Sequence, residues 1–265
     1  MDDLVTDLSP RESSSSSDLS IASSSGIPNG SFETADFQEW NTIGDTSIET
    51  DSLGIFPTDG IYQALITNGD SDAGGSVTDS DLEEFLDLVP GSLDGLVGGD
   101  ATEGSVIKQT ITVEAGDVIS FDWNFLTNEG TPSATFNDSA FLNFNGFTFE
   151  LADTGANFVD APDVDQFSEQ TDTQTLTFSV ANAGTYTIGF GVVDVGDEIV
   201  DSGLAIDNVA IQSSGDSLVG ASSSSSSSSS VDLVFGDGGF TSTDSDSAND
   251  SASGLVFGEN GFEVV

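Results

Sequence analysis

An Asn-Gly dipeptide at positions 145–146, with short runs of alternating residues on both sides, constrains the fold more than any other sequence feature. Asn-Gly favours a type I′ turn, because both central residues of that turn need a positive φ. The pattern therefore predicts a β-hairpin of residues 140–144 and 147–151. One face of this hairpin carries the apolar residues that we expect in a core: Ala140, Leu142, Phe144, Phe147, Phe149 and Leu151.

Two further hairpins are predicted, one from 107–113 and 118–125 and the other from 176–180 and 185–193. Alternation predicts that one face of each is buried, with these inward residues: Ile107, Ile111, Val113, Ile119, Phe121, Trp123, Phe125, Leu176, Phe178, Val180, Tyr186, Ile188, Phe190 and Val192. Other strands are expected at 27–33, 47–49, 61–67 and 204–211. Together these strands favour an all-β fold, an antiparallel two-sheet β-sandwich of jelly-roll type.

A short helical insertion interrupts the strands. Ser80 and Glu83 have the spacing of a capping box, and Pro90 ends the segment. A second helical turn is expected at 92–97. The insertion is interpreted either as a lid over one end of the sandwich or as a crossover connection, and its apolar face carries Leu82, Phe85, Leu86 and Val89.

Composition changes along the chain divide it into four parts. Residues 1–26 are acidic and Ser-rich and predict a flexible arm, followed by the β-sandwich at 27–212. Residues 213–230, which end in nine consecutive serines, predict a polyserine linker. Residues 231–265 form the last part, so the sandwich is expected to have flexible Ser-rich tails.

The last part contains a near-repeat, Leu-Val-Phe-Gly-Asp-Gly-Gly-Phe at 233–240 and Leu-Val-Phe-Gly-Glu-Asn-Gly-Phe at 255–262. Each copy is too short to fold alone. Three interpretations remain open for it. The copies form a docked strand pair, they augment the sheet edge of another subunit, or they are a recognition tail for export or anchoring.

The chain has 47 acidic and two basic residues, a formal charge of −45, and neither Cys nor His. Disulfides, zinc fingers and His-dependent nucleophiles are therefore excluded. Nucleic acid is excluded as a partner, because two basic residues cannot neutralise several phosphates. Anionic lipid would be repelled, and no apolar run is long enough for membrane insertion.

Paired carboxylates are the common catalytic scheme that this composition permits. With so many acids, chance proximity gives no evidence for such a pair, and basic residues that would position an anionic substrate are scarce. The sequence therefore favours a protein that is not an enzyme, and a carboxylate glycosidase remains an alternative.

Cation binding has better support, because calcium prefers carboxylate and amide oxygens. Asn68, Asp70, Asp72 and Asp79 occupy positions one, three, five and twelve of a loop that resembles an EF-hand, although Ala73 replaces the expected Gly. The alternative is a solvated acidic loop. Further acidic clusters are predicted in loops: Asp160, Asp163 and Asp165, and Asp194, Asp197, Glu198 and Asp201.

Three segments resemble a known family: Asn-Gly-Ser-Phe-Glu at 29–33 followed by Trp40, Asp-Gly-Ile-Tyr-Gln-Ala-Leu at 59–65, and Ala-Ile-Asp-Asn-Val-Ala-Ile at 205–211. They are similar to the galactose-binding-like jelly roll of carbohydrate-binding modules. The stretch 104–129 also resembles uncharacterised secreted proteins of cyanobacteria.

This resemblance implies that the first and last segments lie side by side with a structural calcium between them. It implies Glu33 and Asp207 as calcium ligands, together with Asn29 and Asp59. Sugar binding would use exposed aromatic side chains. Trp40 is the candidate for ligand binding, with the alternative that it packs inside as in the resembled family, whereas Phe141 is predicted to point outward from its strand.

The start of the chain has no apolar signal segment, and the composition and the final Phe-Glu-Val-Val resemble type I secretion substrates. We therefore expect an extracellular or cell-surface protein whose folding depends on calcium outside the cell. A cytoplasmic protein from a salt-accumulating organism is the alternative.

The favoured function is a secreted, non-catalytic, calcium-stabilised β-sandwich that acts as a structural or adhesive protein of the cell surface or extracellular matrix. One alternative is a carbohydrate-binding module. Another is a self-assembling filament or layer subunit that uses its C-terminal strands. The expected partners are divalent cations, and polysaccharide or other copies of the same chain.

Overall fold

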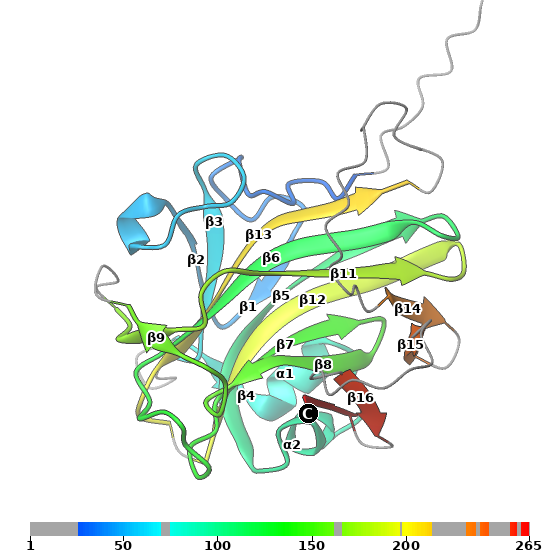
Figure 1. Ribbon diagram of the computed structural model, residues 1–265. Coiled ribbons are helices and arrows are strands. Elements are labelled where there is room, and N and C mark those ends of the chain that lie inside the picture. The colour runs from blue at the N-terminus through cyan, green and yellow to red at the C-terminus, as the bar shows by residue number, and fades with distance from the viewer. Residues whose placement is uncertain are drawn as a thin grey trace, which may run out of the picture.

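A computed structural model describes residues 26–69, 75–161, 166–196, 198–213, 232–236, 239–243, 255–258 and 261–264. Two sheets pack face to face (Figure 1). The first sheet has the order β1-β5-β12-β7-β8, with β4 beside β5. Its strands are β1 (Asn41–Ile43), β4 (Val77–Thr78), β5 (Ala101–Val113), β7 (Ser139–Phe144), β8 (Phe147–Asp153) and β12 (Gly184–Val195).

The second sheet has the order β15-β14-β11-β6-β13-β3-β2, with β10 beside β6 and β9 beside β10. Apart from the parallel pair β11 and β14, its neighbours are antiparallel. The predicted all-β sandwich of jelly-roll type is confirmed. The strands of this sheet are β2 (Asp45–Glu49), β3 (Gln63–Thr67), β6 (Val118–Thr127), β9 (Val159–Asp160), β10 (Glu169–Gln170), β11 (Gln174–Val180), β13 (Ser202–Gln212), β14 (Asp232–Gly236) and β15 (Gly239–Thr243).

The Asn-Gly hairpin forms as predicted between β7 and β8. Asn145 and Gly146 have φ values of 53° and 85°, and Phe144 lies opposite Phe147. Phe147 is nevertheless 43% exposed, so its expected place in the core is wrong. It lies next to the turn, where the two sheets no longer enclose it, and packs on Phe235.

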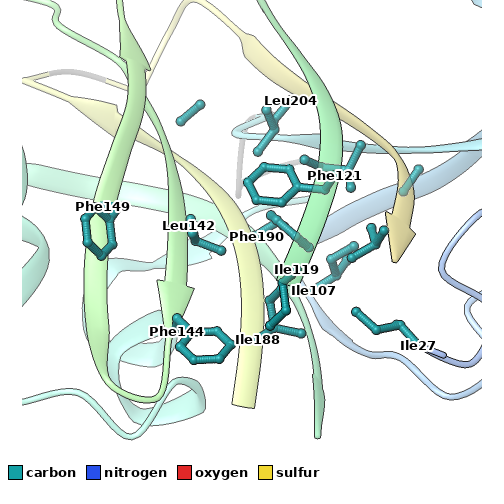
Figure 2. Packing of buried hydrophobic residues seen from close by; sticks show 14 of the residues in the cluster. Ile27, Ile107, Ile119, Phe121, Leu142, Phe144, Phe149, Ile188, Phe190 and Leu204 are labelled. Carbon is teal, nitrogen blue, oxygen red and sulfur yellow. The ribbon is translucent and has the colours of Figure 1, made fainter. Parts of the chain in front are cut away.

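The other two predicted hairpins are wrong, because β5 and β6 lie in different sheets, as do β11 and β12, and each connection crosses from one sheet to the other. The residues predicted to face inward on these four strands nevertheless all lie in the core between the sheets, with Trp123, Leu176 and Tyr186 partly buried at its margin. Figure 2 shows side chains of both sheets meeting there. The rings of Phe121 and Phe190 meet edge to face with centroids 4.7 Å apart. Each fully buried Phe contributes about 2 kcal/mol, so the aromatic residues supply a large part of the apolar burial that stabilises the sandwich.

The helices α1 (Asp79–Phe85) and α2 (Ser92–Val97) confirm the helical insertion. They do not cover an end of the sandwich. They pack on the outer face of the first sheet, where Leu82 and Leu93 enclose Phe141. Phe141 therefore points outward from its strand as predicted, but the helices bury it completely.

The predicted capping residues have other roles. Thr78 is the N-cap of α1, and its hydroxyl accepts a bond from the N–H of Asp81. Glu83 instead accepts bonds from the N–H groups of Gly91 and Leu93 at the start of α2, both 2.9 Å long. Glu83 thus joins the two helices, because its carboxylate satisfies N–H groups that the short helix leaves unpaired.

Lys108 on β5 fixes the other end of α1. Its ammonium donates to the carbonyl oxygen of Phe85 and lies 4.4 Å from the centre of the Phe85 ring. A cation is favourable at a helix C-terminus, where carbonyl groups are unpaired. One of the two basic residues of the chain therefore attaches the helical insertion to the first sheet.

The segment 27–33 is not the expected strand. It forms successive turns, with positive φ at Asn29 and Phe32 and a bond from the N–H of Phe32 to the carbonyl of Asn29. The N–H of Val209 donates to the carbonyl of Gly30 at 2.9 Å. The first and last segments of the resemblance therefore lie side by side, as it implied.

The strands β16 (Leu255–Gly258) and β17 (Gly261–Val264) form a separate antiparallel pair. The predicted arm at 1–26 and linker at 213–230 lie almost entirely outside the described residues and stay predictions. Among the residues that the structure describes, no helix is long and apolar enough to cross a membrane.

Candidate functional site

The loop between β2 and β3, residues 50–62, carries exposed apolar side chains next to a groove. It begins with the 3-10 helix η1 (Asp51–Leu53), which Thr50 caps at its N-terminus. Leu53 and Ile55 point inward and join a second apolar cluster on the outer face of the second sheet. This anchoring leaves the next residue, Phe56, exposed at the surface.

Asp207 on β13 holds the middle of this loop. Its Oδ2 atom accepts bonds from the N–H groups of Thr58 at 2.7 Å and Asp59 at 2.9 Å, and its Oδ1 atom accepts one from the N–H of Asn208. The side chain is 3% exposed, and this burial raises its pKa although the hydrogen bonds oppose the shift. Asp207 therefore acts as a buried acceptor for loop backbone.

Glu33 holds the end of the same loop. Its Oε1 atom accepts bonds from the N–H groups of Ile61 at 2.8 Å and Tyr62 at 2.9 Å. Gly60 has a φ of +74°, and a Cβ there would overlap the Glu33 carboxylate. Glycine is thus required for the close approach. Asp59 accepts a bond from the Ser31 hydroxyl at 2.6 Å.

These bonds fix an open groove of about 390 Å³. Phe56 is 76% exposed and Ile61 is 61% exposed. Apolar side chains displayed on a backbone that is held at several points are typical of a binding surface, because their exposure is otherwise unfavourable. The groove is lined by Thr50, Asp51, Phe56, Pro57, Gly60 and Ile61.

Polar side chains of the second sheet adjoin the groove. Phe56 also lines a narrow recess together with Gln63, Asn124 and Asp207. Asn124 donates to the side chain of Gln170 at 2.8 Å, and Gln63 donates to the carbonyl of Ile55 at 2.8 Å. An aromatic ring thus stands beside amide and carboxylate groups that are already oriented.

Trp40, the candidate for ligand binding, lies in the core and offers no exposed ring. It is 6% exposed and packs on Phe32 and Phe190. Its indole N–H donates to the carbonyl of Asn29 at 3.0 Å. Sequence reasoning placed it in a polar stretch, but the turns of segment 27–33 fold over it. The Asn29 amide donates to the carbonyls of Asp36 and Gln38, so it also stabilises turns.

The residues that the resemblance implies as calcium ligands have other hydrogen-bond partners in the structure. Glu33 and Asp207 face N–H groups, and the described residues contain no group of three or more acidic side chains that could hold a metal ion. Because backbone N–H groups surround these two carboxylates, their surroundings fit a role in holding the loop better than a role as metal ligands.

The EF-hand-like loop is described only at its ends. The Asn68 amide donates to Asp138 at 3.0 Å and its oxygen accepts the N–H of Ser202 at 2.6 Å. Asp79 is the first residue of α1, and burial raises its pKa. Asp70 and Asp72 lie outside the described residues, so calcium binding by this loop stays a prediction.

A buried pair of carboxyl groups, Asp138 and Asp194, was not predicted. They are 0% and 2% exposed and share a side-chain hydrogen bond. Such a bond needs a proton on one partner. Burial raises the pKa of Asp138, whereas bonds from Ser202 and Asn68 oppose the shift. Asp194 was placed in an acidic loop because its neighbours are acidic, but it lies inside β12.

No model of a known protein family matches the chain, and no curated protein matches it. Among solved structures, the chain is similar to the module TmCBM61 in complex with β-1,4-galactotriose, at 14% identity and a TM-score of 0.38, covering 71% of this chain and 97% of that one. It is also similar to the K1 adhesin domain of Lys-gingipain from Porphyromonas gingivalis, at 14% identity, a TM-score of 0.39, and 70% and 96% coverage.

A third similar structure is CBM28, a carbohydrate-binding module specific for non-crystalline cellulose. The identity is 12% and the TM-score 0.36, with 70% of this chain and 93% of that chain covered. The class of the protein, a two-sheet β-sandwich, rests on its own strand pairing.

Proposed function

We propose that the protein is a non-catalytic, extracellular β-sandwich that binds carbohydrate through the groove beside Phe56 and Ile61. The observation that carries the proposal is the exposure of these two side chains on a loop that Glu33 and Asp207 fix. Sugar rings present apolar faces that pack on such side chains, while nearby polar groups bind hydroxyls. A structural or adhesive role at a cell surface would use this binding.

The charge of the chain narrows the ligand class. With a formal charge of −45, the protein repels acidic polysaccharides at moderate ionic strength. Asp51 lies in the groove lining and adds to this repulsion. A neutral polysaccharide is therefore the proposed ligand.

The absence of catalysis is part of the proposal. Hydrolysis of a glycosidic bond requires two carboxyl groups about 5 to 10 Å apart on opposite sides of that bond. Among the described residues that line the groove, Asp51 is the single carboxylic acid. The adjoining recess is lined by two further acids, Asp207 and Asp122. Asp207 accepts bonds from backbone N–H groups. Asp122 accepts bonds from the Thr175 hydroxyl and the Asn208 amide, so both carboxylates already have partners.

Affinity electrophoresis on a panel of galactan, mannan, xylan and amorphous cellulose tests the proposal. We expect retardation on at least one of these, and Phe56→Ala should weaken binding at least about tenfold, or about 1.4 kcal/mol. Val89→Ala is the matched control, because Val89 is 75% exposed between α1 and α2, away from the groove. Equal binding by wild type and Phe56→Ala would contradict the proposal, as would no binding to any neutral glycan.

A further inference from the structure

The two copies of the C-terminal repeat form hairpins with the same register. In β14 and β15, Phe235 pairs with Phe240 and Gly236 with Gly239. In β16 and β17, Phe257 pairs with Phe262 and Gly258 with Gly261. Six of the eight positions are identical in the two copies, and the two that differ lie between the paired glycines. The copies are therefore equivalent in backbone pairing and in apolar side chains.

The first copy is part of the sandwich. Strand β14 pairs in parallel with the edge strand β11, so that Phe178 lies opposite Leu233 and Val180 opposite Phe235. The N–H of Ala181 donates to the carbonyl of Phe235 at 2.8 Å. These bonds involve backbone atoms, so they depend on strand geometry and not on side-chain identity.

Two phenylalanines of the first copy fill a pocket between the sheets. Phe235 and Phe240 are 3% and 7% exposed. The pocket walls come from β7, β8, β11 and β12, which belong to both sheets, and Figure 1 shows β14 and β15 at this end of the sandwich. We call this pocket the dock; its walls are Phe144, Phe147, Phe149, Phe178 and Tyr186.

The packing in the dock is close. The Phe240 ring lies 3.9 Å from that of Phe149, and the Phe235 ring lies 4.7 Å from that of Phe144, both edge to face. Each such aromatic pair adds to the hydrophobic gain of burial. The dock thus recognises two phenylalanines at a fixed spacing on one face of a tight hairpin.

We propose that the second copy of the repeat is an alternative occupant of this dock in the same chain. The first copy contacts β11 through its backbone and fills the dock with Phe235 and Phe240, and the second copy has Phe at both equivalent positions, 257 and 262. Only 11 residues, 244–254, separate the two hairpins in sequence, and such a short separation gives a high effective concentration. The charge of −45 opposes docking from a neighbouring chain.

Exchange of the two copies would change the length of chain between the sandwich and the docked hairpin. With the first copy docked, that segment is 214–231, and with the second copy docked it is 214–253. The first hairpin would then be released from the sheet. The tail would therefore switch between a short and a long tether without unfolding the sandwich.

Three full-length variants test this exchange. Phe235→Ser with Phe240→Ser disables the first copy, Phe257→Ser with Phe262→Ser disables the second, and the quadruple variant disables both. We expect the quadruple variant to lose about 10 °C in melting temperature. The first double variant should lose less than half of that, because the second copy replaces the first, and the second double variant should melt as wild type.

Hydrogen exchange at residues 178–181 reports the dock directly. Protection should persist in the first double variant and disappear in the quadruple variant, with both proteins monomeric in sedimentation equilibrium. If the first double variant loses the same melting temperature and protection as the quadruple variant, the proposal is overturned. Protection that persists only in a dimer would overturn the assignment of the occupant to the same chain.

Discussion

Two short segments of the molecule carry phenylalanine, but one exposes it to solvent and the other buries it. The loop 50–62 displays Phe56 at the surface, whereas the hairpin of β14 and β15 buries Phe235 and Phe240. Carboxylates that accept bonds from backbone N–H groups hold the loop around Phe56, whereas the hairpin is held by backbone pairing with β11 and also by the packing of its own phenylalanines. Phe56 has no part in holding its loop and is free for a ligand, whereas Phe235 and Phe240 are used in holding their hairpin.

The largest loss of stability is expected from a substitution in the dock. Phe144→Ala removes a fully buried ring that contacts Phe178, Tyr186 and Phe235. We expect a loss of about 4 kcal/mol in the free energy of unfolding, measured by chemical denaturation. Phe144→Leu should cost less than half of this. A loss below about 1 kcal/mol in the alanine variant would show that the dock adds little to stability.

Removing a carboxylate that holds the loop 50–62 should destabilise the protein less than Phe144→Ala does, but it should abolish carbohydrate binding. Asp207→Ala removes the charged acceptor of the N–H groups of Thr58 and Asp59, which costs about 3 kcal/mol, or about 1.5 kcal/mol for each bond. We also expect loss of polysaccharide retardation, because the groove loses its fixed backbone. Asp207→Asn keeps one acceptor oxygen and should have an intermediate melting temperature. Unchanged binding in Asp207→Ala would contradict the role of this residue in positioning the groove.

The next test is the effect of calcium on stability, because the predicted ligands in the loop 68–79 belong neither to the loop 50–62 nor to the hairpin of β14 and β15. Calcium at about 100 times its dissociation constant should raise stability by about 2.7 kcal/mol. We expect this rise in wild type and in Glu33→Gln, and its loss in Asp70→Asn with Asp72→Asn, each followed by thermal melts with calcium or chelator. An unchanged melting temperature in wild type would refute calcium stabilisation.

A pH-dependent effect is expected at Glu150 on β8. Burial, with Asp153 nearby, raises the pKa of Glu150 to about 7, although a bond from Ser139 opposes the shift. The folded protein therefore holds this proton more tightly than the unfolded chain, so the associated stability is complete below about pH 4.5 and is lost as the pH rises to about 7.

Glu150→Gln should remove that dependence. The full shift corresponds to about 3 kcal/mol, and partial solvation of the side chain reduces our expectation to about 2 kcal/mol between pH 4.5 and 7.5. Denaturation curves at both pH values measure it, with the exposed Glu39→Gln as the control for charge removal. An equal pH dependence in wild type and Glu150→Gln would contradict the assignment.

The smallest effect on stability is expected at Phe56. Because its ring is mostly exposed, Phe56→Ala should change the free energy of unfolding by less than about 0.5 kcal/mol. The same variant should lose carbohydrate binding. A large loss of stability would mean that this ring is buried in solution, and the contrast with the dock would disappear.

Local patterns predicted most of the sandwich. The Asn145-Gly146 turn and the alternation on either side involve residues close in sequence, so the hairpin and its buried face were visible without tertiary information. Segment 27–33 failed because its conformation depends on contacts with Val209, far away in the chain. Local β propensity cannot report such a contact.

The candidate groove was not predicted, because its loop has no periodic pattern. Two acids that are distant in sequence fix its backbone. Asp207 binds the N–H of Thr58 across 149 residues, and Glu33 binds the N–H of Ile61 across 28 residues. The resemblance implied these two acids as calcium ligands, a role that stays a prediction, and did not point to their bonds with this loop. The missed signal was Gly60, which fits the close approach of a carboxylate to backbone and marks the loop as a built structure.

The position of Lys108 also affects how readily trypsin-like proteases cleave the folded protein. Trypsin-like proteases cleave after Lys or Arg, and this chain offers them Arg11 and Lys108 alone. Lys108 lies in β5, paired with Asn41 on one side and Gly189 on the other. A protease needs an extended, unpaired segment, so cleavage there requires β5 to leave the sheet. The same strand that anchors α1 thus makes the folded sandwich a poor substrate for digestion.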